Sequence, residues 1–240
     1  MMLSLVGANM FFARSTADTL LAQGQENLRR GDYAPALQAF NQALDVQPDN
    51  TAALTGKGQA LLGLGDYTEA AKQFEQAIQQ DPTNELYVLL GNTYFYHSEE
   101  SRVPRRKQLL EQAETAYLQA LKLKSKSPQA LTAMAWNLRM QDNFDESVHY
   151  FKESLAIDDK QADAHNGLGW NYLDLGHDRQ ARDHFEAAVQ LDPDFANAFY
   201  GLGKARAAMD DIDGAIEAYE KALELEPDMR DAQDALERLP

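Results

Sequence analysis

The side chains most able to bind a metal or transfer protons are five histidines, at positions 97, 149, 165, 177 and 184. A zinc site of the His-Glu-x-x-His type needs two histidines four residues apart on one helix. No pair has this spacing, and His177 and His184 are seven residues apart on a segment rich in charge. The chain has no cysteine, which excludes thiolate–metal sites and disulfides. We therefore predict no metal site and no cofactor.

Two glycine–lysine clusters, at residues 56–58 (GKG) and 201–204 (GLGK), resemble parts of phosphate-binding loops. Such a loop follows a strand, begins with a glycine and ends in lysine followed by serine or threonine. Neither cluster has these features. The 38 carboxylate side chains fall on predicted outer helix faces and turns rather than converging in one pocket. The sequence therefore predicts no catalytic residue, and the chain is not expected to be an enzyme.

The overall charge narrows the class of partner. The formal net charge of the 240 residues is −16, and the pI is near 4.6. Nucleic-acid binding requires a basic surface, so this charge argues against it. It argues equally against broad adhesion to anionic membranes. Because an acidic surface attracts basic partners, we expect the partner to be a protein or peptide.

The elements that must position any binding residues recur with a period of 34. The segment 28–50 (LRRGDYAPALQAFNQALDVQPDN) aligns without gaps with residues 62–84 at this offset. The same offset relates residues 168–194 to residues 202–228. Each unit contains two helical patterns joined by a short turn, and a fixed period of this length is typical of a solenoid.

The pattern resembles the tetratricopeptide repeat (TPR). Its signature is a small residue at position 8, Gly-Asp-Tyr near 15–17, alanine at 20 and 27, an aromatic at 24 and proline at 32. Position 24 here holds Phe40, Phe74, Tyr117, Phe151, Phe185 and Tyr219. The small residues let paired helices approach closely, and the aromatic fills the space between successive hairpins.

The resemblance implies an all-α fold, a right-handed superhelical α-solenoid of about six TPR helix-turn-helix hairpins. We place the hairpins at residues 17–50, 51–84, 85–127, 128–161, 162–195 and 196–229. Residues 230–240 resemble a further first helix that is acidic and then stops, which predicts a C-terminal capping helix. No hairpin buries its apolar face alone, so stacking is needed to form the core.

The third hairpin is nine residues longer than its neighbours, and the excess falls between its helices, within residues 97–112. This basic insertion contains Arg102, Arg105, Arg106 and Lys107. Residues 98–127 carry seven basic and four acidic side chains, a net charge of +3 in a chain of −16. One interpretation is a lengthened, solvated turn. The other is a docking surface for an acidic partner or an anionic head-group layer.

In TPR proteins the first helix of each hairpin lines a concave groove, and position 9 is one of its lining positions. Trp136 and Trp170, the only tryptophans, occupy position 9 in consecutive repeats. The predicted partner-binding groove adds Arg139, Asn166, Tyr200, Lys204, Tyr96 and Asn92. Aromatic anchors dominate binding hot spots, which favours a peptide-binding role. The alternative is that the indoles pack against the next hairpin. No three consecutive repeats have the residues of the co-chaperone subtype that clamps a terminal carboxylate.

Residues 1–16 form an apolar leader whose first charged residue is Arg14. Residues 1–13 are too short to span a bilayer and lack the basic stretch of a signal peptide. Three interpretations stay open: the remnant of an export signal or anchor, a cap on the first repeat, or a disordered tail. The compartment is therefore unknown. A cytoplasmic location is slightly favoured, and export or membrane anchoring would follow from the signal interpretation.

These observations predict a non-catalytic scaffold or adaptor that holds a partner peptide or helix in the concave groove. The alternative is a structural or assembly-factor subunit that self-associates or docks on a membrane complex. The apolar N-terminus and the basic insertion motivate that alternative, in which membrane contact would involve only the N-terminus and a homo-oligomer would form. A fold of this kind does not by itself name the partner.

Overall fold

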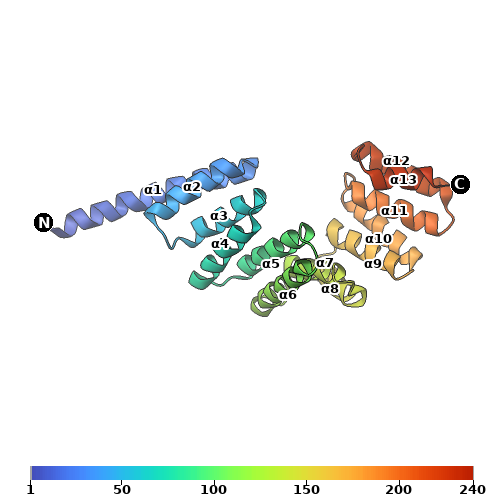
Figure 1. Ribbon diagram of the computed structural model, residues 1–240, viewed down its shortest axis with the longest axis horizontal. Helices are drawn as coiled ribbons and strands as arrows, with labels where there is room; N and C mark the ends of the chain where they lie inside the picture. Colours follow the sequence, from blue (N-terminus) through green and yellow to red (C-terminus); the bar gives the residue numbers. More distant parts are fainter. Residues whose placement is uncertain (1, 240) are drawn as a thin grey trace. The chain divides into compact units, whose positions relative to one another are not determined.

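The computed structural model describes the backbone of residues 2–239 and the side chains of residues 15–239, which form thirteen α-helices (Figure 1). In chain order they are α1 (Met2–Arg30), α2 (Tyr33–Val46), α3 (Thr51–Gly63), α4 (Tyr67–Gln80), α5 (Asn84–Glu99), α6 (Arg105–Leu123), α7 (Pro128–Arg139), α8 (Phe144–Ile157), α9 (Ala162–Asp174), α10 (Asp178–Leu191), α11 (Ala196–Ala208), α12 (Ile212–Leu225) and α13 (Arg230–Glu237). Helices α1 to α12 pair as six hairpins, which confirms the predicted all-α TPR solenoid.

The chain divides into two compact units, Met1–Ser125 and Lys126–Pro240. The first unit holds the hairpins from α1 to α6, and the second unit holds those from α7 to α12 together with α13. In the first unit, α1 contacts α3 and α3 contacts α5; in the second, α7 contacts α9 and α9 contacts α11. Each unit therefore has a row of first helices, which we call its first-helix face.

One aromatic side chain at position 24 of each hairpin fills the core. Phe40, Phe74, Phe151 and Phe185 are fully buried, and Tyr117 and Tyr219 nearly so. The glycines of the first helices make room for these rings. A Cβ atom at Gly169 would lie 2.6 Å from Phe185 Cε1, and one at Gly201 only 2.3 Å from the same atom. One ring thus holds its own hairpin and the next hairpin together.

A left-handed backbone residue ends the first helix in five of the six hairpins. Gly31, Gly65 and Gly176 have φ values of 77°, 78° and 73°, and Asp142 and Asp210 have φ values of 60° and 62° at the equivalent position. Glycine adopts this conformation without strain, and a short polar side chain such as aspartate tolerates it. The turn therefore needs only this one special backbone position and no long loop.

The third hairpin departs from the sequence-based expectation of a lengthened turn. Its helices have 16 and 19 residues, whereas those of the second hairpin have 13 and 14. The inserted residues therefore extend both helices and leave a short connection at residues 100–104. The physical reason is composition, because Arg, Lys, Gln, Leu and Glu in residues 105–112 all favour helix.

The structure describes side chains at the C-terminal end of the chain but only the backbone at the N-terminal end. Helix α13 packs against α12, with Ala232 fully buried. At the N-terminus, α1 begins at Met2, so the backbone of the apolar leader continues the first helix. The side chains of residues 1–14 lie outside the described residues, and the three interpretations of the leader remain predictions. Among the described residues, no helix combines the length and apolarity that a membrane crossing requires.

Candidate functional site

The two tryptophans occupy equivalent places on the first-helix face of the second unit. Trp136 Nε1 donates a hydrogen bond to Asp163 Oδ2 on α9 at 2.9 Å, and Trp170 Nε1 donates one to Asn197 Oδ1 on α11 at 2.8 Å. Each indole also packs edge to face against the buried phenylalanine of its own hairpin, at centroid distances of 5.4 and 5.3 Å. Both rings are half-buried. They therefore join neighbouring hairpins and still present part of their surface to solvent.

Tyr200 and Lys204 extend this surface onto α11. The Tyr200 ring lies 5.7 Å from the Trp170 ring, and Lys204 Nζ lies 5.5 and 5.7 Å from the centroids of Trp170 and Tyr200. These distances suit cation–π attraction. Partial burial, followed by the charge of Asp231, raises the pKa of Tyr200, so its phenol stays neutral. The three side chains form an amphipathic platform.

Asn166 lies on α9 one turn before Trp170 and is only 3% exposed. Its side-chain Oδ1 is buried and accepts no hydrogen bond from any described residue. A buried acceptor without a donor carries a desolvation cost, which an arriving N–H group would offset. Asp163 lies one turn earlier on the same helix. Burial raises the pKa of its carboxyl group, partly opposed by the hydrogen bond from Trp136.

Arg139 has a place in the fold as well as in the predicted groove. Its Nη1 lies 2.6 Å from Asp174 Oδ2 and donates to Asn171 Oδ1 at 3.0 Å. Asn171 Nδ2 in turn donates to Ser147 Oγ, and Ser147 Oγ donates to the Ala135 carbonyl oxygen, both at 2.7 Å. Arg139 thus ends a polar network that joins the fourth and fifth hairpins. The sequence signal for it was Ser147, at a position where five repeats have alanine.

The remaining predicted groove residues, Asn92 and Tyr96, lie on α5 in the first unit, apart from the six in the second unit. Asn92 Oδ1 accepts a hydrogen bond from the Tyr117 hydroxyl at 2.8 Å, which ties α5 to α6. Tyr96 is 44% exposed. The structure therefore places Trp136, Trp170, Arg139, Asn166, Tyr200 and Lys204 in the second unit and the other two in the first, and the contacts join Trp170, Tyr200 and Lys204 directly.

The first-helix face of the first unit carries a hollow that sequence reasoning missed. Its volume is about 410 Å³, and it lies among α1, α3 and α5. The lining residues are Gln25, Thr51, Ala52, Thr55, Gly56, Gln59, Thr83, Glu85, Leu86 and Leu89. Only Glu85 among them is charged. A run of small uncharged residues at the groove positions of the second repeat was the available signal.

A histidine pair on the second unit also escaped the sequence analysis. His165 Nδ1 on α9 lies 3.0 Å from His184 Nδ1 on α10. The Tyr172 ring stacks on His184 at 5.5 Å, and Lys152 Nζ from α8 lies 5.5 Å from the Tyr172 centroid. Burial, then the charges of His165 and Lys152, lowers the pKa of His184 to about 4, against a weaker opposing effect of Asp183. Burial also lowers the pKa of His165, opposed by Asp159.

This pair predicts a loss of stability in mild acid. Because the folded pKa of His184 lies below the unfolded value of 6.5, the unfolded chain binds the proton first. The free energy of unfolding is therefore highest above pH 6.5, where His184 is neutral in both states, and it decreases as the pH falls toward 4. We expect His184→Gln to remove about 1–2 kcal/mol of this pH dependence, allowing for partial exposure. Measuring Tm from pH 7.5 to 4.5 tests this expectation.

His149→Gln, at an exposed site, is the control. Identical slopes of Tm against pH in the wild type, His184→Gln and His149→Gln would contradict the prediction.

Comparison with known proteins agrees with this geometry. Models of the tetratricopeptide repeat family match residues 21–85, 162–195 and 196–229, more than half of the chain in total. No curated protein matches the sequence.

Three solved structures illustrate the similarity of fold. The APC/C heterotetramer Cut9–Hcn1 has a TM-score of 0.81 at 19% identity, over 93% of this chain and 42% of that chain. This chain thus spans less than half of that relative. PilW, a type IV pilus biogenesis factor, has a TM-score of 0.76 at 19% identity, over 92% and 98%. YrrB, a TPR protein with an unusual peptide-binding site, has a TM-score of 0.59 at 19% identity, over 84% and 99%.

At these identities the solved structures establish the fold, and the repeat matches establish the family. The buried aromatic rings at position 24 and the close contacts of these rings with glycines are the features that the matched repeat positions determine. This chain belongs to the tetratricopeptide repeat family.

Proposed function

We propose that this protein is a non-catalytic interaction scaffold that holds a partner peptide or helix against the first-helix face of its second unit. The observation that carries the proposal is the row of Trp136, Trp170 and Tyr200, which lie on α7, α9 and α11, the first helices of three successive hairpins. All three rings are partly exposed. Such rings bury a large area at low entropic cost when a partner covers them.

The polar groups beside the rings indicate what kind of segment would fit. The Asn166 Oδ1 is buried, so it would accept a hydrogen bond from an N–H group of the partner once the side chain turns toward the surface. Lys204 is exposed and would attract a carbonyl or carboxylate. The partner is therefore a segment with apolar side chains for the rings and available main-chain polar groups. In this proposal Arg139 keeps the hairpins in register and contacts the partner only at the edge.

The similar proteins support this class of function. Cut9 is found in a complex with Hcn1, and YrrB has a peptide-binding site. The hollow among α1, α3 and α5 gives the first unit a second place where a partner would contact the first helices. Because the candidate residues are aromatic anchors and hydrogen-bonding groups, the proposed role of the protein is that of an adaptor.

A specific observation favours the assembly-factor alternative as a second function. Val103, within the basic insertion, is 80% exposed, and Arg102, Arg105 and Lys107 around it are exposed as well. An apolar residue between cations is a suitable contact for an acidic surface. PilW, which has a similar fold, is a biogenesis factor.

We expect substitutions on the aromatic row to weaken partner binding by about tenfold or more, the loss of one hot-spot contact. The measurement is affinity capture from the native host, followed by titration calorimetry with the captured partner. Trp136→Ala and Trp170→Ala should keep the helical circular dichroism spectrum. Lys204→Glu changes an exposed side chain whose contacts are the cation–π contacts with Trp170 and Tyr200, so it should weaken binding with only a small change in Tm.

The matched control is Tyr33→Ala, which removes a 38% exposed ring from α2. Its binding should equal that of the wild type. Unchanged affinity in Lys204→Glu, together with a large loss of Tm in both tryptophan variants, would assign the indoles to packing and reject the proposed site.

A further inference from the structure

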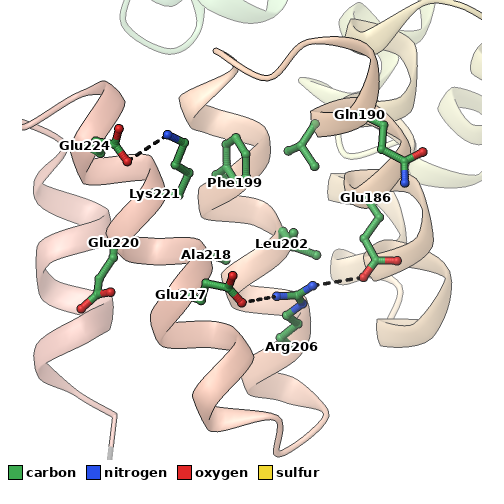
Figure 2. A pocket seen from close by; sticks show the side chains of 11 residues that line it. Glu186, Gln190, Phe199, Leu202, Arg206, Glu217, Ala218, Glu220, Lys221 and Glu224 are labelled. Atoms are coloured by element: carbon green, nitrogen blue, oxygen red, sulfur yellow. Dashed lines mark hydrogen bonds and ion pairs between the residues drawn. The ribbon is translucent and has the colours of Figure 1, made fainter.

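The second unit has a cleft of about 640 Å³ among α10, α11 and α12 (Figure 2), and its lining residues do not include Trp136, Trp170 or Tyr200. Its lining combines apolar and charged side chains: Glu186, Val189, Gln190, Phe199, Leu202, Arg206, Glu217, Ala218, Glu220, Lys221 and Glu224. Leu202 and Ala218 are buried and form its floor, while Val189 and Phe199 are half-buried. The floor therefore suits one aliphatic side chain.

The walls of the cleft are acidic. Glu217, Glu220 and Glu224 lie three and four residues apart on one face of α12, and Glu186 faces them from α10. Lys221 Nζ lies 2.9 Å from Glu224, an exposed pair that contributes little to stability. Glutamates thus outnumber the cations of the lining by two to one.

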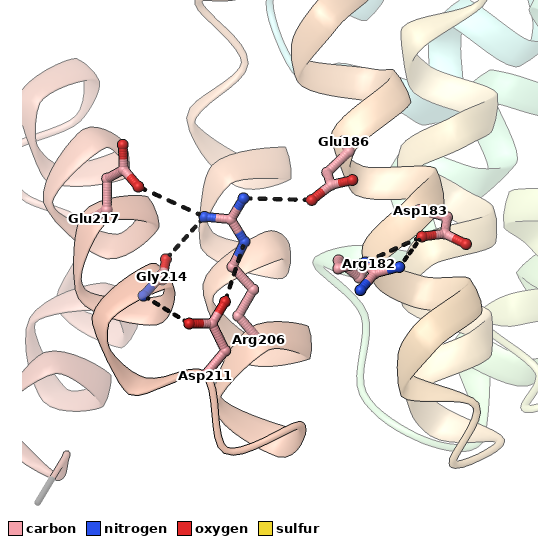
Figure 3. Close-up of polar contacts among 7 residues, drawn as sticks. All are labelled: Arg182, Asp183, Glu186, Arg206, Asp211, Gly214 and Glu217. Atoms are coloured by element: carbon pink, nitrogen blue, oxygen red, sulfur yellow. Dashed lines mark hydrogen bonds and ion pairs between the residues drawn. The ribbon is translucent and has the colours of Figure 1, made fainter.

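Arg206 leaves little positive charge available in the cleft. Its guanidinium lies 3.3 Å from Glu186, 3.8 Å from Glu217 and 4.0 Å from Asp211 (Figure 3). It also donates to the Gly214 carbonyl oxygen at 3.1 Å. Because three carboxylates already surround it, Arg206 joins the three helices and is not an anion site. The cleft therefore favours a cationic peptide segment that carries one aliphatic side chain.

The chain itself displays such a segment. Residues 102–107 read Arg-Val-Pro-Arg-Arg-Lys, and Val103 is the most exposed large apolar side chain among the described residues, at 80%. The first turn of α6 holds three cations, no acidic residue and no side-chain cap. A helix N-terminus favours anions, so these cations are unfavourably placed in the isolated chain. Carboxylates brought by another molecule would relieve this repulsion.

We propose that this cleft binds residues 102–107 of a second copy of the chain. Val103 occupies the apolar floor beside Phe199 and Leu202, and the flanking arginines pair with the glutamates of α12. The cleft and the segment lie in different units, so the contact is heterologous and each copy offers both halves. Such a contact propagates from copy to copy unless a rotation closes it into a ring.

The contact is small and charged, which determines its strength. One anchor and a few ion pairs bury far less area than a permanent interface, so we expect a dissociation constant of roughly 10–100 µM. Exposed ion pairs are screened by salt, and association should weaken several-fold between low salt and about 0.5 M NaCl. This surface does not overlap the aromatic row, so self-association and partner binding are separable.

Sedimentation equilibrium of the full chain, in low salt over roughly 5–300 µM to bracket the expected constant, tests the proposal by charge reversal and complementation. Arg102→Glu with Arg105→Glu alters the segment and also improves the first turn of α6, so folding is preserved. Glu220→Lys with Glu224→Lys alters the cleft. Each double variant alone should associate at least tenfold more weakly than wild type. An equimolar mixture should form 1:1 heterodimers, because one variant keeps the cleft and the other keeps the segment.

Matched reversals elsewhere serve as controls. Lys122→Glu with Lys124→Glu changes two exposed cations at the other end of α6, and Glu226→Lys with Asp228→Lys changes two exposed carboxylates beyond α12. Both should associate like wild type. A wild type that stays monomeric throughout, a mixture without heterodimers, or controls that weaken association equally would each overturn the proposal. The first of these outcomes would leave the cleft to a different protein.

Discussion

Phe185→Ala lowers the free energy of unfolding by about 3–5 kcal/mol, the usual cost of removing a buried aromatic ring. The ring is fully buried and meets the backbone of Gly169 in its own hairpin and of Gly201 in the next. It also supports Trp170 edge to face at 5.3 Å. Its loss therefore opens a cavity at the junction of two hairpins. Urea unfolding followed by circular dichroism measures the change.

Leu191→Ala on the same helix provides the comparison, because that side chain is 40% exposed. It should cost less than about 1 kcal/mol, as surface changes do. Similar costs in the two variants would mean that Phe185 does not hold the hairpins together.

Gly201→Ala is expected to destabilise the protein by about 1–3 kcal/mol, although alanine favours helix. On an exposed helix the same change stabilises by roughly 0.5–1 kcal/mol. Here the new Cβ would lie 2.3 Å from Phe185 Cε1, and the ring is enclosed on all sides. The sign of the effect therefore reports the close approach of two hairpins. Thermal and urea unfolding both measure it.

A double-mutant cycle isolates the contact. Phe185→Leu should recover part of the loss in the Gly201→Ala background, giving a coupling energy of about 1 kcal/mol or more. Gly63→Ala is the comparison, because its Cβ would meet Tyr33, whose ring is 38% exposed and can move. A stabilising Gly201→Ala would be incompatible with the packing described.

The fold was predictable because its contacts repeat locally. Position 24 is aromatic in all six hairpins, and the rings it supplies are the most deeply buried aromatic rings among the described residues. The turn between the two helices of a hairpin was equally predictable from the sequence, although Asp142 and Asp210 replace glycine at a left-handed position. Helix extension in the third hairpin was not predicted. The spacing showed extra residues but did not show whether they would enter the helices or the connection.

The candidate site was only partly predictable. Repeat position placed Trp136 and Trp170 on the first-helix face, but their bonds to Asp163 and Asn197 depend on side-chain direction between hairpins. His165 and His184 are nineteen residues apart on different helices, so no spacing rule pairs them.

The cleft that contains Arg206 arises where α10, α11 and α12 meet. Its carboxylates looked like an ordinary solvated face in the sequence. Contacts that depend on the separation of second helices in successive hairpins are set by tertiary packing rather than by the repeat pattern.

The central proposal is that partners bind over the two tryptophans, and the chain offers a direct way to observe this. It has only two tryptophans, so a ¹H–¹⁵N spectrum contains two indole N–H signals, one for each half of the proposed site. Titration with the captured partner should shift both signals saturably in the wild type, at the concentrations where calorimetry detects binding. Binding that leaves both indole signals unchanged would contradict the proposed site.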